Sequence, residues 1–314
     1  MENKTISTLD MPREKWLEER RKGIGGSDAA AIMGLNPYKS PLAVYLDKTG
    51  ETPTDNAQSE PAYWGTVLEA PIAKRFAELH PEYKVRRNNH MMFSREYPFM
   101  LADIDREIRT EDGDRIGLEI KTVGTRSARY WENEEVPPYY ICQLQHYACV
   151  TGFKRFIIVA LIGGQTLVER EIPRDEDIIS NLVHQEQDFW RHVVERNPVD
   201  WDGSANSWDI LRSLYPKAEA NKLIQLPANC ADVIGQINEM NQYIESARHS
   251  LGEIEKQRDS LKQTLAAALG DAERGIIGNY EVSYKTVNCA EHTVTAHSYR
   301  KMNIKEIKPN ELNG

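Results

Sequence analysis

The stretch LADIDREIRTEDGDRIGLEIKTV, Leu101 to Val123, decides which fold the chain is expected to adopt. On both sides of the loop TEDGD, polar and apolar residues alternate with the two-residue period of a β-strand. Glu119 and Lys121 therefore project from one face of the second strand, about 7 Å apart. The pattern predicts an antiparallel hairpin with charged side chains gathered on one face.

The register of this hairpin decides whether Asp105 of the first strand meets Glu119. Directly opposite residues share a face, and these two are opposite only if the loop has an odd number of residues or contains a bulge. A two-residue Asp-Gly turn would place Asp105 opposite Ile120 instead. Asp103 has the same parity as Asp105, so its part in the site stays open. The alternative is an ordinary exposed Glu-x-Lys ion pair, worth under about 1 kcal/mol.

Two carboxylates held close together repel each other unless a cation lies between them. Hard oxygen ligands select Mg²⁺ or Mn²⁺, and a neighbouring lysine can orient or deprotonate a water molecule. Asp followed by Glu-x-Lys is the PD-(D/E)xK nuclease signature. The chain departs from it at Ile104, where Pro is usual, and at Arg106, where Gly is usual.

Length and composition fit a globular protein with a sizeable core: 314 residues, of which 40% are hydrophobic. The net charge of −9 argues against a generally basic surface for nucleic acid but not against a local basic groove. The four cysteines are scattered and lack metal-site spacing, so reduced thiols are expected. There is no apolar segment long enough for a signal peptide or a membrane span, which predicts a cytoplasmic protein.

The rest of the chain predicts an α/β fold with two domains. Residues 1–214 are expected to form a PD-(D/E)xK restriction-endonuclease-like core, a small mixed central sheet flanked by helices. Residues 215–314 carry an apolar heptad pattern, which predicts a long helix or a helical hairpin, followed by a β-hairpin. The heptad face suits a partner or self-association, and packing on the first domain is the alternative. Helices are expected at 12–22, 64–78, 140–150 and 174–195, with short capped starts at Ser27 and Ser40, and strands at 83–94, 98–109, 115–123, 155–162 and 166–172.

Five segments resemble the YqaJ-type viral recombinase family, relatives of phage lambda exonuclease. They are RRKGIGGSDAAAIMGLNPYKSP, WGTVLE, LADIDR, GLEIKT and VPPYYICQLQHYACVTG, and they occur in the family's order over roughly residues 20–155. The resemblance implies the fold described above and a metal-dependent nuclease.

The resemblance also implies roles for individual residues. Asp105, Glu119 and the main-chain carbonyl of Ile120 match metal ligands, as does Glu69, for which an exposed helix position is the alternative. Lys121 matches the catalytic lysine. Gln143 matches a glutamine that lines the active site, whereas Gln145 and His146 suit surface or packing positions. Arg20, or Arg21 in the neighbouring register, and Ser27 match a pocket for a DNA 5′ phosphate, which a helix start would favour.

The resemblance implies a Mg²⁺-dependent 5′-to-3′ exonuclease on double-stranded DNA ends, with Mn²⁺ as a substitute. It would leave 3′ single strands for an annealing protein, act as a ring-shaped homo-oligomer, and belong to a phage or prophage in a bacterial host. The alternatives are a structure-specific endonuclease of the same fold and a non-catalytic DNA-end-binding protein. The intact acids and lysine disfavour the latter.

Overall fold

The structure is a computed structural model that describes residues 3–51, 59–215, 217, 219, 222, 224–288 and 298–306. The chain divides into two compact units, Met1–Ala218 and Glu219–Gly314. Within the described residues, no helix is long and apolar enough to cross a membrane. The two units are described in turn.

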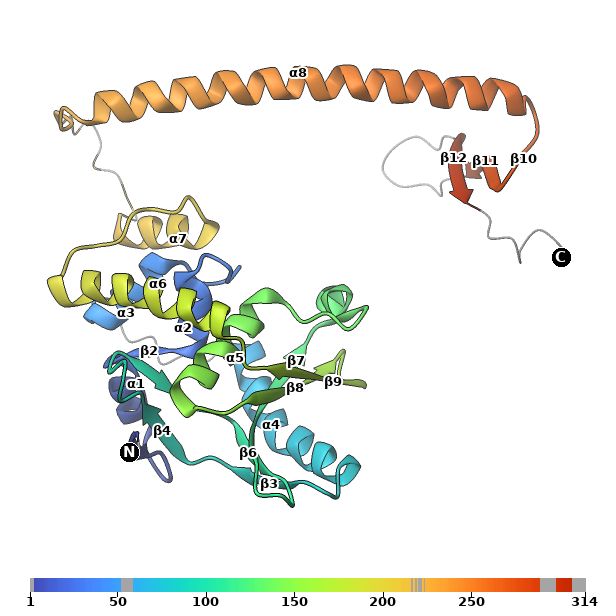
Figure 1. Ribbon diagram of the computed structural model, residues 1–314. Helices are drawn as coiled ribbons and strands as arrows, with labels where there is room; N and C mark the ends of the chain where they lie inside the picture. The colour runs from blue at the N-terminus through green and yellow to red at the C-terminus, as the bar shows by residue number, and fades with distance from the viewer. Residues whose placement is uncertain are drawn as a thin grey trace. The chain divides into compact units, whose positions relative to one another are not determined.

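The first unit is an α/β structure whose elements follow the chain in the order shown in Figure 1. They are β1 (Lys4–Ser7), α1 (Arg13–Arg21), β2 (Ile24–Gly25), α2 (Gly26–Ile32), α3 (Pro41–Thr49), α4 (Glu60–Leu79), β3 (Lys84–Arg87), β4 (His90–Phe93), β5 (Met100–Ala102), β6 (Arg106–Arg109), β7 (Arg115–Val123), the 3-10 helix η1 (Thr125–Trp131), α5 (Pro138–Thr151), β8 (Arg155–Ile162), β9 (Thr166–Pro173), α6 (Glu176–Glu195) and α7 (Ala205–Leu214).

A five-stranded mixed sheet forms the centre of this unit, in the order β3-β6-β7-β8-β9. Strands β7 and β8 are parallel, and the other neighbours are antiparallel. Parallel neighbours need a crossover, which α5 supplies. The predicted strands 115–123 and 155–162 are confirmed at both ends.

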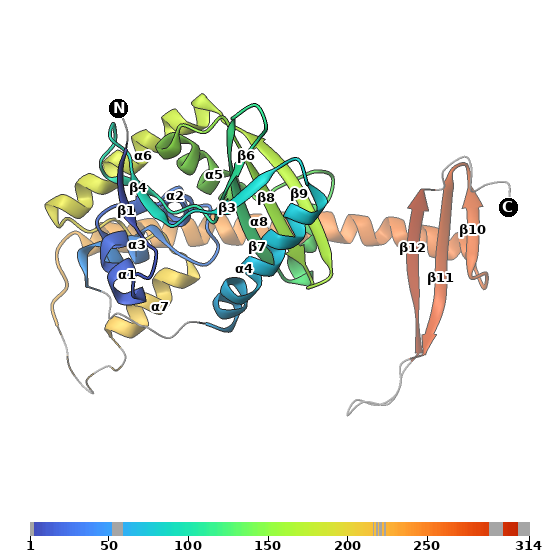
Figure 2. The same cartoon turned by 90° about the horizontal axis from the view of Figure 1, so that it is seen from below.

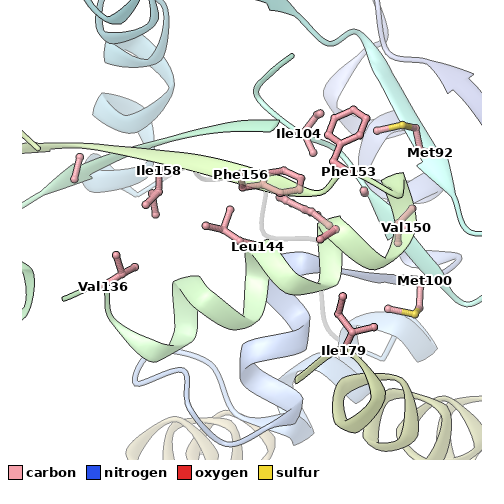
Figure 3. Close-up of a cluster of buried hydrophobic side chains, with 14 of the residues drawn as sticks. Met92, Met100, Ile104, Val136, Leu144, Val150, Phe153, Phe156, Ile158 and Ile179 are labelled. Atoms are coloured by element: carbon pink, nitrogen blue, oxygen red, sulfur yellow. The ribbon is translucent and has the colours of Figure 1, made fainter. Parts of the chain in front are cut away.

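Alternate residues of the central strands feed two separate cores. Helix α4 covers one face, where Phe76 packs with Leu118, Ile157 and other buried apolar residues. Helix α5 covers the other face, where Leu144 and Phe156 belong to the cluster drawn in Figure 3. Helix α6 packs beside α5 (Figure 2). Glu119 and Lys121 therefore belong to the face that α5 covers.

Gly117 in β7 is required by the packing on this α5 face. A Cβ atom at Gly117 would lie 1.9 Å from the ring of Phe156 on the neighbouring strand. The ring therefore occupies the space that a side chain at position 117 would need.

A second sheet, in the order β1-β4-β5-β2, was not predicted. Its strands β2 and β5 are two and three residues long, too short to show a period in the sequence. The pairing of Ile24 with Met100 and Gly25 with Leu101 brings the glycine turn next to the segment that leads to Asp105.

Several predicted boundaries were wrong. Helix α4 begins at Glu60 and contains Pro71, which costs one backbone hydrogen bond without ending the helix. Ser27 does not cap α2; Gly25 occupies the N-cap position. The predicted strands 83–94 and 98–109 are each broken in two. The capped start at Ser40 is confirmed, since its side chain accepts a hydrogen bond from the Ala43 N–H.

The second unit consists of one long helix, α8 (Cys230–Leu269), and a three-stranded sheet of β10 (Arg274–Ile277), β11 (Tyr280–Asn288) and β12 (Ser298–Glu306). The long helix predicted by the heptads is confirmed and runs through Gly252 without a break. The predicted hairpin is extended by β10, and residues 294–297 of its expected second strand lie outside the described residues. Figure 2 shows the three strands side by side.

Candidate active site

The register of the β6–β7 hairpin brings two acids to one face. Arg106 pairs with Leu118, and the loop between the strands comprises residues 110–114. A loop of five residues is odd, so the condition derived from the sequence is confirmed. Continuing the same register by one residue places Asp105 opposite Glu119.

Glu119 is the centre of a buried hydrogen-bonded group. Its side chain is almost fully buried, and Oε1 accepts hydrogen bonds from Lys121 Nζ at 2.6 Å and from Gln143 Nε2 at 2.7 Å. Its other oxygen, Oε2, is buried and has no hydrogen-bond partner within the described part of the chain. A buried carboxylate oxygen without a donor is costly unless it binds something else.

Asp105 is held against the same strand by a hydrogen bond from the Ile120 N–H to Oδ2, at 2.8 Å. Burial and the nearby Glu119 carboxylate raise the pKa of Asp105 well above its ordinary value. Burial also raises the pKa of Glu119. Full ionisation of both acids is therefore unfavourable without a further cation, which is the electrostatic condition for a divalent ion.

Lys121 completes this group as a cation. Burial opposes its charge, but Glu119 and Asp105 outweigh that effect and raise the pKa of the ammonium group. Its Nζ also lies 5.1 Å from the centre of the Tyr140 ring. Lys121 is therefore a donor at neutral pH, able to orient a water molecule or a phosphate oxygen rather than to take up a proton.

Glu69 approaches from α4 and is paired with Arg106, whose guanidinium donates to Glu69 Oε1. The same guanidinium nitrogen donates to the Asp105 carbonyl at 2.7 Å. Across the described residues, no set of three or more His, Cys, Asp and Glu side chains is arranged to hold a metal ion. Asp105 and Glu119 meet, but Glu69 is held by Arg106, so its place as a third ligand stays a prediction.

Arg106 is a site residue that the sequence analysis did not select. It is mostly buried and connects α4 to β6 beside Asp105. The available signal was its position directly after Asp105, where the nuclease signature usually has Gly.

The predicted phosphate residues lie together at the other end of the site. The Arg20 guanidinium donates to Ser27 Oγ and lies 5.3 Å from the Trp16 ring. Arg21 instead pairs with Asp47 at 3.1 Å. Of the two registers left open, the structure therefore places Arg20 with Ser27.

A cavity of about 580 Å³ joins these groups. Its walls include Arg20, Ser27, Glu69, Asp103 and Asp105. The predicted phosphate residues and three acids thus face the same space, although they come from distant parts of the sequence.

Asp103 has a different partner from Asp105. Its Oδ2 accepts a hydrogen bond from Trp16 Nε1 at 2.6 Å, and burial raises its pKa. It lines the shared cavity but is not hydrogen-bonded to the group around Glu119.

A second residue group missed by the sequence analysis lies behind Ser27. Asp28 is fully buried and lies 2.7 Å from Lys48 Nζ, 2.9 Å from Lys39 Nζ and 3.7 Å from the Arg20 guanidinium. Although burial opposes ionisation, the three cations hold the pKa of Asp28 well below its usual range. Asp28 therefore fixes the base of the pocket in which Arg20 lies.

Of the three α5 residues Gln143, Gln145 and His146, Gln143 alone reaches Glu119. Gln145 donates to the Pro173 carbonyl at 2.7 Å, and both ring nitrogens of His146 are bound, to Glu186 at 2.8 Å and to the Leu101 carbonyl at 2.9 Å. Both residues are thus packing residues of the interior.

Comparisons with known proteins give one family match and several similar proteins. Residues 15–154 match the model of the YqaJ-like viral recombinase domain. The uncharacterized protein YqaJ of Bacillus subtilis (strain 168) is 39% identical over 281 residues, which cover 88% of this chain and 85% of the relative. Protein D345L of African swine fever virus (strain Badajoz 1971 Vero-adapted) is 34% identical over 83 residues, 26% of this chain and 24% of the viral protein.

The fold is similar to that of an alkaline exonuclease, LHK-Exo, from Laribacter hongkongensis. The crystal structure of LHK-Exo in complex with dAMP aligns with a TM-score of 0.50 and 18% identity, over 64% of this chain and 97% of that one. This likeness concerns the fold alone.

Proposed function

Because this chain belongs to the YqaJ-like viral recombinase family, we propose that it is a Mg²⁺-dependent deoxyribonuclease of phage-type recombination, acting 5′ to 3′ on double-stranded DNA ends. The observation that carries the proposal is Glu119, which is bound by Lys121 and Gln143, lies opposite Asp105, and keeps one buried oxygen without a partner. A protein that only bound DNA would have no use for this combination.

The donor set fits a hard divalent cation. Mg²⁺ or Mn²⁺ would be held by Asp105, Glu119 and the main-chain carbonyl of Ile120. Glu69 would become a further ligand if its hydrogen bond to Arg106 were broken. When bound, the ion supplies Lewis-acid activation of water and of phosphate oxygens. The excess negative charge of the acid pair is what makes this position favourable for it.

The side chains of the chain itself orient the reaction. Lys121 is a fixed ammonium donor that orients the attacking water or a non-bridging phosphate oxygen. Gln143 holds Glu119 in one rotamer, and the Ile120 N–H holds Asp105. Fixed donors of this kind need no reorganisation as charge develops on the phosphate.

Preference for a 5′ end is supported by the cavity that Arg20 and Ser27 share with the acids. Arg13 and Arg87 also line it, so the cavity presents three arginines beside its three acids. The relative named alkaline exonuclease was crystallised with dAMP, a mononucleotide. Generation of 3′ single strands for an annealing protein, and assembly into a ring, belong to the same proposal.

The test uses linear duplex DNA labelled at the 3′ ends, with either a 5′ phosphate or a 5′ hydroxyl. We expect progressive shortening of the labelled strands from their 5′ ends in Mg²⁺ and none in EDTA. Lys121→Met and Glu119→Gln should each lower the rate by at least about 100-fold, since one well-placed donor contributes that much in comparable sites. Lys84→Met, at an exposed position of β3, serves as the matched control and should keep wild-type activity.

The alternatives give different products. Nicking of closed circular DNA would identify a structure-specific endonuclease. Retention of DNA ends without any cleavage, in Mg²⁺ or Mn²⁺, would identify a non-catalytic end-binding protein and overturn the proposal.

A further inference from the structure

The long helix of the second unit exposes a continuous apolar face. No residue of α8 is buried, and large side chains such as Ile237, Leu251 and Leu261 are 53%, 56% and 69% exposed. A helix of this length extends about 60 Å. Proteins rarely leave so long an apolar stripe in water, so the face is built to be covered.

The spacing on this face is that of a two-helix seam. Steps of three and four alternate over about five heptads, a 3.5-residue period that keeps one stripe facing a partner helix. Arg258 is the only charged member. The seam consists of Val233, Ile237, Met240, Ile244, Ala247, Leu251, Ile254, Arg258, Leu261, Leu265 and Ala268.

The charge at Arg258 distinguishes the possible arrangements of two copies. A parallel pair in register would place Arg258 beside Arg258 of the second copy, two like charges within the seam. An antiparallel pair centred between residues 252 and 253 places it opposite Ala247 of the second copy instead. The small alanine side chain leaves room for the guanidinium to extend to solvent.

An antiparallel pair with this centre also matches the charges of the residues that flank the seam. It places Leu251 opposite Ile254 of the second copy, and it brings Arg248 beside Glu255 of the second copy. The two-fold symmetry repeats this charge pair on the other side of the centre. Opposite charges at flanking positions determine partner and orientation in coiled coils. Each residue of the helix thus finds its matching residue on a second copy of the same helix, arranged about one two-fold centre. Pairing with a different protein would not require this symmetry.

We propose that α8 pairs with α8 of a second copy of this chain as an antiparallel two-stranded coiled coil. This dimer contact is separate from the catalytic site, and it is tested by measurements that do not involve activity.

Site-directed cross-linking of the full chain tests the arrangement. In a Cys230→Ser/Cys289→Ser background, the double variant Ala247→Cys/Arg258→Cys should form a covalent dimer under mild oxidation. Neither single variant should do so, since like positions in the antiparallel pair lie about 17 Å apart along the axis. Both substitutions leave the large apolar residues of the seam unchanged.

Other results would overturn the proposal. Cross-linking of each single variant indicates a parallel pair. No cross-linking of any variant indicates that α8 is covered by another part of the chain or by a different protein.

A charge exchange gives an independent check. Arg248→Glu or Glu255→Arg alone should lower the cross-linking yield of the double-cysteine variant at limiting concentration, with the dimer weakened about tenfold by two repulsive pairs. Arg248→Glu with Glu255→Arg should restore it. If the exchange fails to restore the yield, these two residues do not face each other.

Discussion

Arg106 lies opposite Leu118 in the β6–β7 hairpin, and this one pairing decides which side of the sheet the acids occupy. Leu118 faces α4 and its neighbour Glu119 faces α5, so the same register buries the core and assembles the site. A shift by one residue would turn Leu118 away from the core under α4 and would also separate the two acids. Stability and activity therefore depend on the same pairing.

Removing the charge of Asp105 should stabilise the metal-free protein. Its pKa is raised in the fold, so the wild type loses stability as the pH rises from the unfolded-state pKa through the raised one. In chelator at pH 7.5, Asp105→Asn should therefore resist urea better, by on the order of 1 kcal/mol. Mg²⁺ should raise the unfolding midpoint of the wild type but not of the variant. A variant less stable than wild type in chelator would contradict this account.

Arg20 should determine the preference for phosphorylated ends. We expect Arg20→Ala to reduce the ratio of rates on 5′-phosphate and 5′-hydroxyl DNA by about tenfold, because a charge-assisted contact is lost. Arg21→Ala is the control, since Arg21 pairs with Asp47, and the ratio should stay unchanged. The ratio is insensitive to loss of folded protein. An equal effect of both variants would argue against the pocket at Ser27.

Asp28 should stabilise the first unit in a pH-dependent way. Asp28→Asn removes the nearer counter-charge of the fully buried Lys48 ammonium, which should cost about 3 kcal/mol at pH 7. Because the folded-state pKa of Asp28 is lowered, its contribution is present above the unfolded-state pKa and is lost as the pH falls through the folded-state value. The difference between wild type and variant should therefore shrink below about pH 4.

Urea unfolding from pH 7 to pH 3 measures this difference. Asp188→Asn, which removes the exposed partner of Arg191 on α6, is the control and should cost under about 1 kcal/mol. A difference for Asp28→Asn that is independent of pH would show that its charge has no part in stability.

Gly117 should tolerate no side chain. Gly117→Ala places a methyl group in the Phe156 ring and should cost about 1–3 kcal/mol. Gly65→Ala, in α4, meets only the Thr122 hydroxyl at an ordinary 3.7 Å and should raise stability by up to about 1 kcal/mol. Thermal unfolding of both variants distinguishes packing from a general intolerance of glycine replacement.

The local pattern of the sequence was sufficient for the hairpin and for part of the site. The two-residue period placed Glu119 and Lys121 on one face, and parity required an odd number of loop residues, which the structure has. The heptads likewise predicted α8, because the spacing of its apolar residues along the chain is by itself the signal of a long helix. These are properties that neighbouring residues determine among themselves.

Contacts between distant segments could not be predicted in the same way. Nothing in the spacing of Arg106 indicates that it binds Glu69 from α4 rather than solvent. Asp28 looked like an ordinary residue of a short helix, and its burial against Lys48 depends on how α2 and α3 pack. The strands of the second sheet are too short for any period, so tertiary pairing alone defines them.

Because Arg20, Ser27 and the acids share one cavity, the proposed enzyme would repeat the same binding and cleavage at every nucleotide. Attack of water at phosphorus, with departure of the 3′ oxygen of the excised nucleotide, leaves a new 5′ phosphate on the remaining strand. Each cut thus recreates the chemical group that the pocket recognises, one unit further along. Because the pocket and Asp105 lie at fixed positions in one cavity, we expect products of uniform length, independent of base sequence.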